Sequence, residues 1–208
     1  MGSSESEVPN EVLEIEIKTE KVIKGSPPFC PMSSILKSNN STCKIVCMDW
    51  CGTGFLISLP IIKNGNRLCG LVTNNHVLPQ GELLNGRTFT IIFDANNQQQ
   101  KVHLTNEKFR FTSSLLDVTF IEFSPSELPS DVSFLTANEA TTDPKTYAFM
   151  TQHPLGGCCS MAQGNINKIY GFDLKHKIST QPGSSGSPLV NNDGIVIGVH
   201  KAGIIKEN

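Results

Sequence analysis

Short apolar and β-branched runs follow one another along the chain, and clusters of turn-forming residues separate them. Apolar and polar positions alternate within the runs, or a few apolar residues stand together, and both patterns favour β-strands. The clusters KNGN at 63–66 and NNDG at 191–194 contain the Gly and Asn residues that tight turns need. No helical period persists for three turns. The runs are KIVCMDW, GTGFLISL, GLVTNNHV, RTFTIIFD, LLDVTFIEF, TYAFMTQ, INKIYGF and GIVIGVH. The pattern predicts an all-β protein, arranged as a pair of barrels or sandwiches.

One interruption of the strand pattern, SPSELPSDVS at 124–133, combines prolines with acidic residues and is the best candidate for a boundary between two units. We therefore expect a first β-barrel over residues 26–125 and a second over residues 126–208. Residues 1–25 form an N-terminal extension in this interpretation. It holds one alternating strand candidate, VLEIEI, from Val12 to Ile17.

Composition and charge exclude several classes of protein. The 208 residues are 38% hydrophobic, which suffices for a folded core, and their net charge is −2. Such a chain has no basic field for nucleic acid and no polybasic membrane patch. No apolar run is long enough to span a bilayer, and the acidic N-terminus does not resemble a secretory signal. Gly2 with Ser6 fits the N-myristoylation pattern, but an initiator methionine followed by small residues is the interpretation we favour.

The cysteines indicate a reducing compartment. Seven is an odd number, which favours free thiols over a disulfide framework, and we expect a cytoplasmic or nuclear protein. Cys43, Cys47 and Cys51 are spaced by four residues without an accompanying C-x-x-C pair, which is a weak pattern for zinc. Small buried side chains on or near a strand are the preferred interpretation of these three. We expect neither a metal nor an organic cofactor.

The segment STQPGSSGSPLV at 179–190 places two adjacent serines among glycines and a proline. A serine hydroxyl becomes an effective nucleophile only when an imidazole takes its proton and a carboxylate holds that imidazole. Backbone N–H groups must also converge on the developing oxyanion. Gly183 permits this, because without a Cβ its own N–H and that of Ser185 can point to one place. Ser185 is therefore a candidate nucleophile, and a flexible polar loop is the alternative.

Candidates for the other two groups precede the serine. His76 ends an apolar run and begins a turn, a position where a rigid strand can hold a base at a cleft. A core or surface histidine is the alternative. Asp117 begins an apolar run, and because unpaired burial of a carboxylate is costly, either it has a partner or its side chain lies in water. The chain order His, Asp, Ser is one of several known for catalytic triads.

Four segments taken together, GTGFLI, LVTNNHV, LDVTFIEF and QPGSSGSPLV, resemble the signature segments of chymotrypsin-fold serine peptidases. The likeness is strongest to V8-like glutamyl endopeptidases and to intracellular, HtrA-like trypsin-fold peptidases. It implies two six-stranded Greek-key antiparallel β-barrels with a cleft between them. It also implies a serine endopeptidase in which His76 is the base, Asp117 orients it and Ser185 is the nucleophile. The N–H groups of Gly183 and Ser185 would form the oxyanion hole.

The same resemblance implies a pocket for the side chain that precedes the cut bond. Its candidate residues are Ser179, Thr180, His200 and Gly203. The segment GVHKAG is similar to the G-[IV]-H-x-x-G segment of peptidases that cut after Glu or Gln. An imidazole and a hydroxyl can donate hydrogen bonds to a carboxylate or a carboxamide, but they offer no counter-charge to Lys or Arg. We therefore expect cleavage of proteins or peptides after Glu or Gln. A solvent-facing strand histidine is the alternative interpretation of His200.

Three features depart from the family pattern. Ser184 stands where zymogen-activated members have an aspartate, and Val77 stands where secreted members have a bridging cysteine. The sequence ends five residues after Gly203, before the last strand and helix of the family. We expect the C-terminal barrel to be closed by an N-terminal strand or left incomplete, unless the sequence is a fragment. A trypsin-fold binding module that has lost turnover is therefore the alternative function, and an esterase would share the same chemistry.

Overall fold

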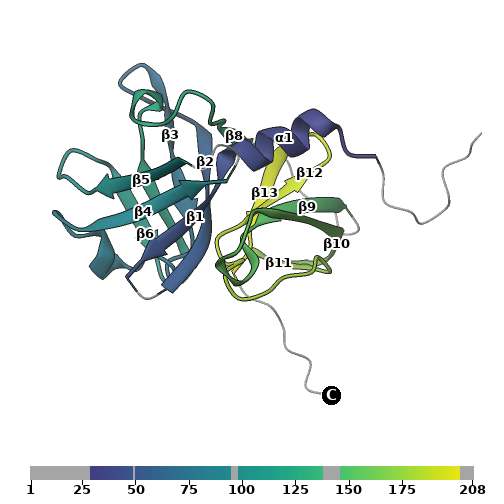
Figure 1. The fold of residues 1–208 in the computed structure, drawn as a ribbon. Coiled ribbons are helices and arrows are strands. Elements are labelled where there is room, and N and C mark those ends of the chain that lie inside the picture. Colours follow the sequence, from purple (N-terminus) through teal and green to yellow (C-terminus); the bar gives the residue numbers. More distant parts are fainter. Residues whose placement is uncertain (1–28, 49, 95–97, 138–145, 202–208) are drawn as a thin grey trace, which may run out of the picture.

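The computed structural model describes residues 29–48, 50–94, 98–137 and 146–201, and strands dominate them (Figure 1). The all-β prediction is confirmed. The strands are β1 (Thr42–Cys47), β2 (Trp50–Lys63), β3 (Asn66–Thr73), β4 (Thr88–Phe93), β5 (Gln98–His103), β6 (Arg110–Ser113), β7 (Val118–Glu122), β8 (Leu135–Ala137), β9 (Tyr147–Gln152), β10 (Ser160–Tyr170), β11 (Asp173–His176), β12 (Pro188–Asn191) and β13 (Ile195–Val199). The helical elements are α1 (Met32–Ser41) and three short 3-10 turns, η1 (Gln80–Leu83), η2 (Pro125–Glu127) and η3 (Pro154–Gly156).

The strands form two lobes that lie side by side, with β1 to β7 in one and β9 to β13 in the other (Figure 1). The short strand β8 joins them, because it pairs in parallel with β2 on one side and with β13 on the other. All other pairings among the described strands are antiparallel. Seven of the ten join strands that follow one another along the chain, and β1–β4, β3–β7 and β9–β12 join strands further apart. This arrangement agrees with the expected two-lobed architecture, while the residue bounds of the two barrels stay a prediction.

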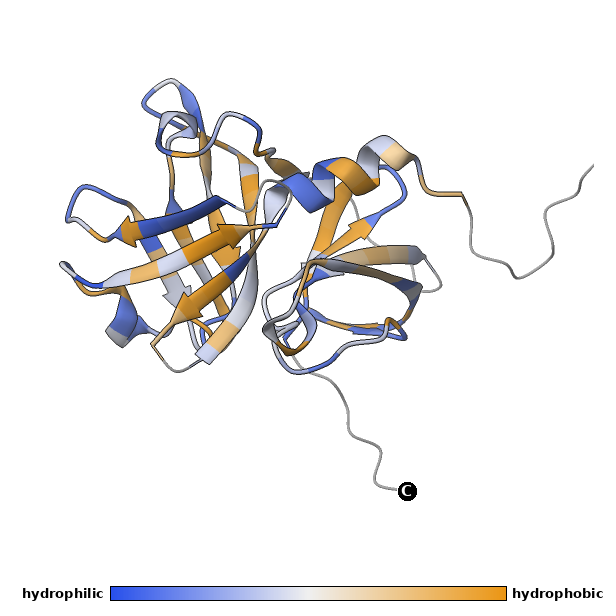
Figure 2. Ribbon diagram, viewed as in Figure 1, coloured by the Kyte–Doolittle hydropathy of each residue, from blue (hydrophilic) through white to orange (hydrophobic). Residues whose placement is uncertain are grey.

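Successive side chains along the strands of the first lobe point to opposite faces of the sheet, and both faces are buried in apolar clusters. Leu56, Leu71 and Ile121, which face one another across β2, β3 and β7, lie in the core of the first lobe. Their neighbours point to the other face of the sheet, where Phe55 and Phe120 meet side chains of the second lobe. Figure 2 shows the apolar residues concentrated on the strands of both lobes. Complete burial of each such side chain stabilises the fold by about 1.5–3 kcal/mol, so the same strands build a core and an interface.

The helix α1 was not predicted, because its sequence MSSILKSNNS has almost no apolar face. Ile35 packs against the apolar cluster between the lobes, and the other buried contacts of the helix are polar. Ser38 Oγ lies 2.8 Å from Thr151 Oγ1 on β9, and Thr42 Oγ1 donates to the carbonyl of Ser38 at 2.8 Å. Ser38 and Ser41 are buried in the helix despite being polar. Hydrophobic periodicity does not predict a helix whose buried contacts are largely hydrogen bonds between hydroxyls.

Two further expectations concern the cysteines and the termini. Cys43 and Cys47 are buried in the first lobe, as predicted, but burial was wrong for Cys51. Cys51 is the second residue of β2 and is exposed, and its Sγ lies close to Gly156 of the other lobe. The extension at 1–25, with its strand candidate Val12–Ile17, lies outside the described residues. Among the described residues, no helix has the length and apolar character that a membrane span requires. The cytoplasmic or nuclear location stays a prediction.

Candidate active site

The serine loop, residues 179–187, is fastened to the start of β2. The N–H of Thr53 donates to the carbonyl of Ser185 at 2.8 Å, and Thr53 Oγ1 donates to the carbonyl of Gly183 at 2.8 Å. On the other side of the loop, the N–H of Gly186 donates to the carbonyl of His200 at 2.8 Å. The half-buried Ser185 therefore stands between the two lobes on a backbone that both of them hold.

Two glycines of the loop have left-handed backbone conformations, with φ of +91° at Gly183 and +89° at Gly186. A Cβ on Gly186 would lie 1.9 Å from the carbonyl oxygen of Thr53. Only glycine fits such a position without strain or collision. Within the described part of the chain, the N–H groups of Gly183 and Ser185 donate to no protein atom. Both donors of the predicted oxyanion hole are therefore unused by the fold.

We expect Gly186→Ala to lower the free energy of unfolding by roughly 3 kcal/mol or more, because the new Cβ strains the backbone and collides with Thr53. The matched control is Gly65→Ala, where φ is +80° and nothing lies within 4 Å of the new Cβ. That variant should lose only about 1–2 kcal/mol. Urea unfolding of both variants measures the difference, and equal losses would contradict the close approach of Gly186 to Thr53.

His76 and Asp117 contact each other at the edge of the first lobe. Asp117 accepts two hydrogen bonds from His76, from Nδ1 at 2.8 Å and from the backbone N–H at 3.0 Å. Asp117 has a φ of +51°, which an aspartate tolerates better than most residues, and its carbonyl accepts from Asn74 Nδ2 at 2.8 Å. The carboxylate thus holds Nδ1 of the imidazole as the protonated nitrogen and leaves Nε2 as an acceptor. Asp117 is paired with His76, so the alternative of a carboxylate facing only water does not apply.

The residues that flank His76 pack against the serine loop and its support. Val77 lies against Gly52, and Thr73 Oγ1 donates to the carbonyl of Thr53 at 2.7 Å. Ser185 Oγ donates to the carbonyl of Lys201 at 3.4 Å, and no hydrogen bond joins it to His76 among the described residues. The structure therefore brings His76 into contact with Asp117, and it brings the end of β3 close to the serine loop through Thr53. The Ser185 hydroxyl itself is turned toward Lys201.

His200 is buried beside a second histidine that the sequence interpretation missed. Its Nδ1 lies 3.1 Å from Nε2 of His176, and the N–H of Ile178 donates to Nδ1 of His176 at 3.2 Å. Because Nδ1 of His176 accepts, its Nε2 carries the proton that is donated to His200, whose own proton is then on Nε2. Burial, and then the neighbouring His176 and His76, lower the pKa of His200 to about 4. Burial also lowers the pKa of His176. At neutral pH the pair is uncharged, with one N–H donor left over.

The other predicted pocket residues, Ser179, Thr180 and Gly203, have fewer contacts in the structure than His200. Ser179 is exposed, and its carbonyl accepts from Gln152 Nε2 at 3.0 Å. Thr180 is half-buried and precedes the turn in which the N–H of Gln181 donates to Ser184 Oγ at 3.2 Å. Gly203 lies outside the described residues. Among those that are described, no group of three or more His, Cys, Asp or Glu side chains is placed to hold a metal ion.

Comparisons with known proteins bear on the family and the fold. The family model described as a trypsin-like peptidase domain matches residues 52–199. A search of curated proteins finds no match. Among solved structures, the serine endoprotease from Yersinia pestis is similar over 86% of this chain, with a TM-score of 0.63 and 14% identity. Rv3671c from M. tuberculosis H37Rv, in an inactive mutant form, is similar over 83% of this chain and 79% of its own, with a TM-score of 0.58 and 20% identity. This chain spans 60% of the Yersinia protein, and both likenesses concern the fold.

Proposed function

The chain belongs to the family of trypsin-like peptidase domains, and we propose that it is a serine endopeptidase acting through His76, Asp117 and Ser185. The observation that carries the proposal is the doubly hydrogen-bonded contact between His76 and Asp117, which lie in the turns after β3 and before β7. Thr73, the last residue of β3, donates to the carbonyl of Thr53, which in turn holds the serine loop. A carboxylate on Nδ1 leaves Nε2 able to take a proton, which is what a nucleophilic serine requires. The V8-like and HtrA-like branches are a finer assignment that rests on the sequence resemblance.

The reaction follows from these positions. Rotation of the Ser185 side chain away from Lys201 directs Oγ to the carbonyl carbon of the substrate. Oγ forms a bond to that carbon, and its proton moves to Nε2 of His76, while the N–H groups of Gly183 and Ser185 receive the oxyanion. The C–N bond then breaks, and the leaving amine takes the proton from His76. Water attacks the resulting ester by the same route and releases the acid. Catalytic hydrogen bonds that are long in a resting enzyme commonly shorten with substrate.

The buried histidine pair supports a preference for glutamine, and next for glutamate, before the cut bond. A neutral His200 offers one N–H, and a carboxamide oxygen accepts it without bringing a charge into a poorly solvated site. A carboxylate would have to lose water without gaining a full counter-charge. A lysine or arginine side chain would meet only neutral donors, so both should be poor substrates.

A panel of matched peptides that differ only at this residue tests the preference. At pH 7.5 we expect kcat/KM for the Gln peptide to exceed that for the Glu peptide roughly tenfold, and that for Lys or Phe roughly a hundredfold. The ratio of Gln to Glu should fall as the pH is lowered toward 5, because His200, whose pKa is about 4, begins to gain a proton that favours the carboxylate. Any effect of pH on the catalytic steps that both peptides share cancels in the ratio.

Variants locate the preference in the pocket. His200→Leu keeps an apolar side chain of moderate size but removes the donor, so the Gln peptide should be cut no faster than the Phe peptide. His103→Leu, at an exposed position on β5, is the control and should leave the preference intact. Faster cleavage of the Lys or Phe peptide by the wild-type protein contradicts the proposed pocket, although not the proposed triad.

One observation favours a second function, a trypsin-fold binding module without turnover. The hydroxyl of Ser185 donates to Lys201 rather than to His76. The backbone of Asp117 argues against this function. Its left-handed φ of +51° is unfavourable in free energy, and a binding module has no need of the contact with His76 that this conformation provides. Covalent labelling of the serine, described in the Discussion, separates the two functions.

A further inference from the structure

We propose that Lys44 and Asp94, two charged side chains of the first lobe, are positioning residues for the oxyanion hole. They hold the rear loop, defined here as residues 153–159, which packs behind Gly183. The inference rests on the proposed function, because it assigns these side chains a part in the same reaction. Neither residue belongs to a motif that the sequence interpretation identified, and neither contacts the groups proposed to react.

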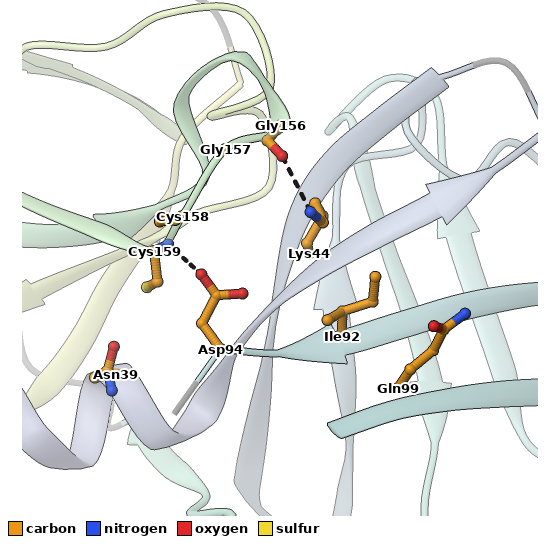
Figure 3. A pocket seen from close by; sticks show the side chains of 9 residues that line it. All are labelled: Asn39, Lys44, Ile92, Asp94, Gln99, Gly156, Gly157, Cys158 and Cys159. Atoms are coloured by element: carbon orange, nitrogen blue, oxygen red, sulfur yellow. Dashed lines mark hydrogen bonds between the residues drawn. The ribbon is translucent and has the colours of Figure 1, made fainter. Parts of the chain in front are cut away.

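Two charged side chains of the first lobe hold the rear loop (Figure 3). Lys44 Nζ, from β1, donates to the carbonyl of Gly156 at 3.1 Å. Asp94, which directly follows β4, accepts the backbone N–H of Cys159 through Oδ2. The same oxygen lies 3.9 Å from Nδ1 of His153. Since β1 and β4 are paired strands, with Lys44 opposite Ile92, the two side chains project from one rigid support.

A cavity of about 730 Å³ opens beside these contacts and is bordered by Lys44, Asp94 and Gly156 (Figure 3). The lobes are therefore joined here mainly by polar links around an open space, and less by a packed apolar core. A charged side chain that donates to or accepts from a backbone group makes a stronger hydrogen bond than a neutral one. Removing either link should loosen the rear loop, because the open space beside it leaves this side of the loop without packed side chains that could take over.

The rear loop is in turn fastened to the backbone of the oxyanion hole. The N–H of Leu155 donates to the carbonyl of Pro182 at 2.6 Å, and the N–H of His153 donates to Thr53 Oγ1 at 3.1 Å. That hydroxyl itself donates to the carbonyl of Gly183. The carbonyl oxygen of His153 would lie 2.6 Å from a Cβ on Gly183. A shift of the loop must therefore move the Gly183 peptide, whose N–H is one of the two proposed oxyanion donors.

The conformation of the rear loop needs such external support. Leu155 has a φ of +54° and Gly156 a φ of +67°, and a left-handed residue other than glycine costs roughly 1–2 kcal/mol. The ring of His153 is fully buried, and its Nδ1 lies 3.0 Å from the carbonyl of Gly157. Burial lowers the pKa of His153, so the ring is neutral and its Nδ1–H can donate to that carbonyl. Internal bonds shape the turn, while Lys44 and Asp94 fix it in place.

The test compares disruptive and conservative variants of each residue. Lys44→Met keeps the aliphatic stem and removes the ammonium, and Asp94→Ala removes the acceptor. We expect kcat to fall about 10- to 100-fold in each, with KM changed less than about twofold, because the donor is misplaced only for the transition state. Lys44→Arg and Asp94→Asn retain a donor and an acceptor, so they should keep most of the activity. Lys63→Met is the matched control, because Lys63 pairs with Glu122 of its own lobe, away from the rear loop.

A peptide aldehyde and the matching alcohol separate positioning from general damage. Ser185 Oγ adds to the aldehyde carbon, and the hydroxyl proton passes through His76 to the hemiacetal oxygen, which occupies the oxyanion hole. The alcohol binds the same pocket without this step. In Lys44→Met, affinity for the aldehyde should fall in parallel with kcat, while affinity for the alcohol stays within about twofold. A loss of fold would weaken both, and unchanged melting temperatures in Lys44→Met and Lys63→Met check this.

Two outcomes overturn the inference alone. One is an active wild-type protein whose Lys44→Met and Asp94→Ala variants keep their kcat. The other is an equal loss of aldehyde and alcohol binding. If Asp94→Ala does not fold, Lys44→Met decides, because its half-buried side chain makes one contact to the loop. A wild-type protein that hydrolyses no peptide and forms no adduct with a serine-reactive probe overturns the proposed function and this inference together.

Discussion

Ser185→Ala is expected to abolish peptide hydrolysis, with kcat lower by a factor on the order of 10⁵ or more. The variant removes the atom that forms the ester and leaves the support of the site in place. Thr53 still donates to the carbonyl of residue 185, and His76 still pairs with Asp117. KM should change little, because the hydroxyl contributes to bond formation and not to binding of the extended substrate. Progress curves with the best substrate of the matched panel measure the loss.

Ser187→Ala is the control for this experiment. Ser187 lies two positions along the same loop, and its buried Oγ has no hydrogen-bond partner among the described residues. Removing a hydroxyl of that kind is nearly neutral or stabilising, so activity and melting temperature should be preserved. Retained hydrolysis in Ser185→Ala, or a matching loss in Ser187→Ala, would contradict the assignment of Ser185 as the nucleophile.

Asp117→Asn is expected to lower kcat by a factor on the order of 10⁴ near neutral pH. The amide has the same shape, its oxygen can still accept the N–H of His76, and asparagine tolerates a φ of +51°. Its NH₂ group, however, donates to Nδ1 of His76 where the carboxylate accepted. The imidazole must then carry its proton on Nε2, and it can no longer accept the proton of Ser185.

The pH profile distinguishes this effect from simple damage to the fold. At high pH, substrate cleavage by Asp117→Asn should recover in part, because hydroxide can replace the missing base. Asp193→Asn, in the turn between β12 and β13, is the control and should behave as the wild type. An Asp117→Asn variant that folds and keeps more than about a tenth of the wild-type kcat would mean that the carboxylate does not orient His76 in the reaction.

Sequence reasoning predicted the parts of this protein that depend on local pattern. Alternation along β2 and β3 indicated strands, and both faces of these strands are indeed occupied. The helix α1 was not predicted because several of its buried contacts are made by hydroxyls, such as that of Ser38, to a strand more than a hundred residues away. The exposure of Cys51 was mispredicted for a related reason, because it depends on how the second lobe packs against the start of β2.

In the candidate site, too, local motifs predicted some residues, while others are visible only in the structure. Motifs predicted His76, Asp117 and Ser185; the first two are in contact, and the catalytic roles of all three stay a prediction. No motif pointed to His176, which lies 24 residues from His200 and supports it. Lys44 reaches the rear loop from 112 residues away. Such partners depend on how sheets and lobes pack, and a single sequence carries no periodicity that records it.

Covalent labelling with a fluorophosphonate, followed by mass mapping of the adduct, tests the central claim most directly. Such a probe reacts with a serine whose proton is removed by a neighbouring base and whose oxyanion is stabilised. The account predicts a single phosphonyl adduct on Ser185 in the wild-type protein, and none in Ser185→Ala. An intact wild-type protein that takes no label, or that takes it on Ser184 or another residue, contradicts the claim that Ser185 is activated by His76 and Asp117.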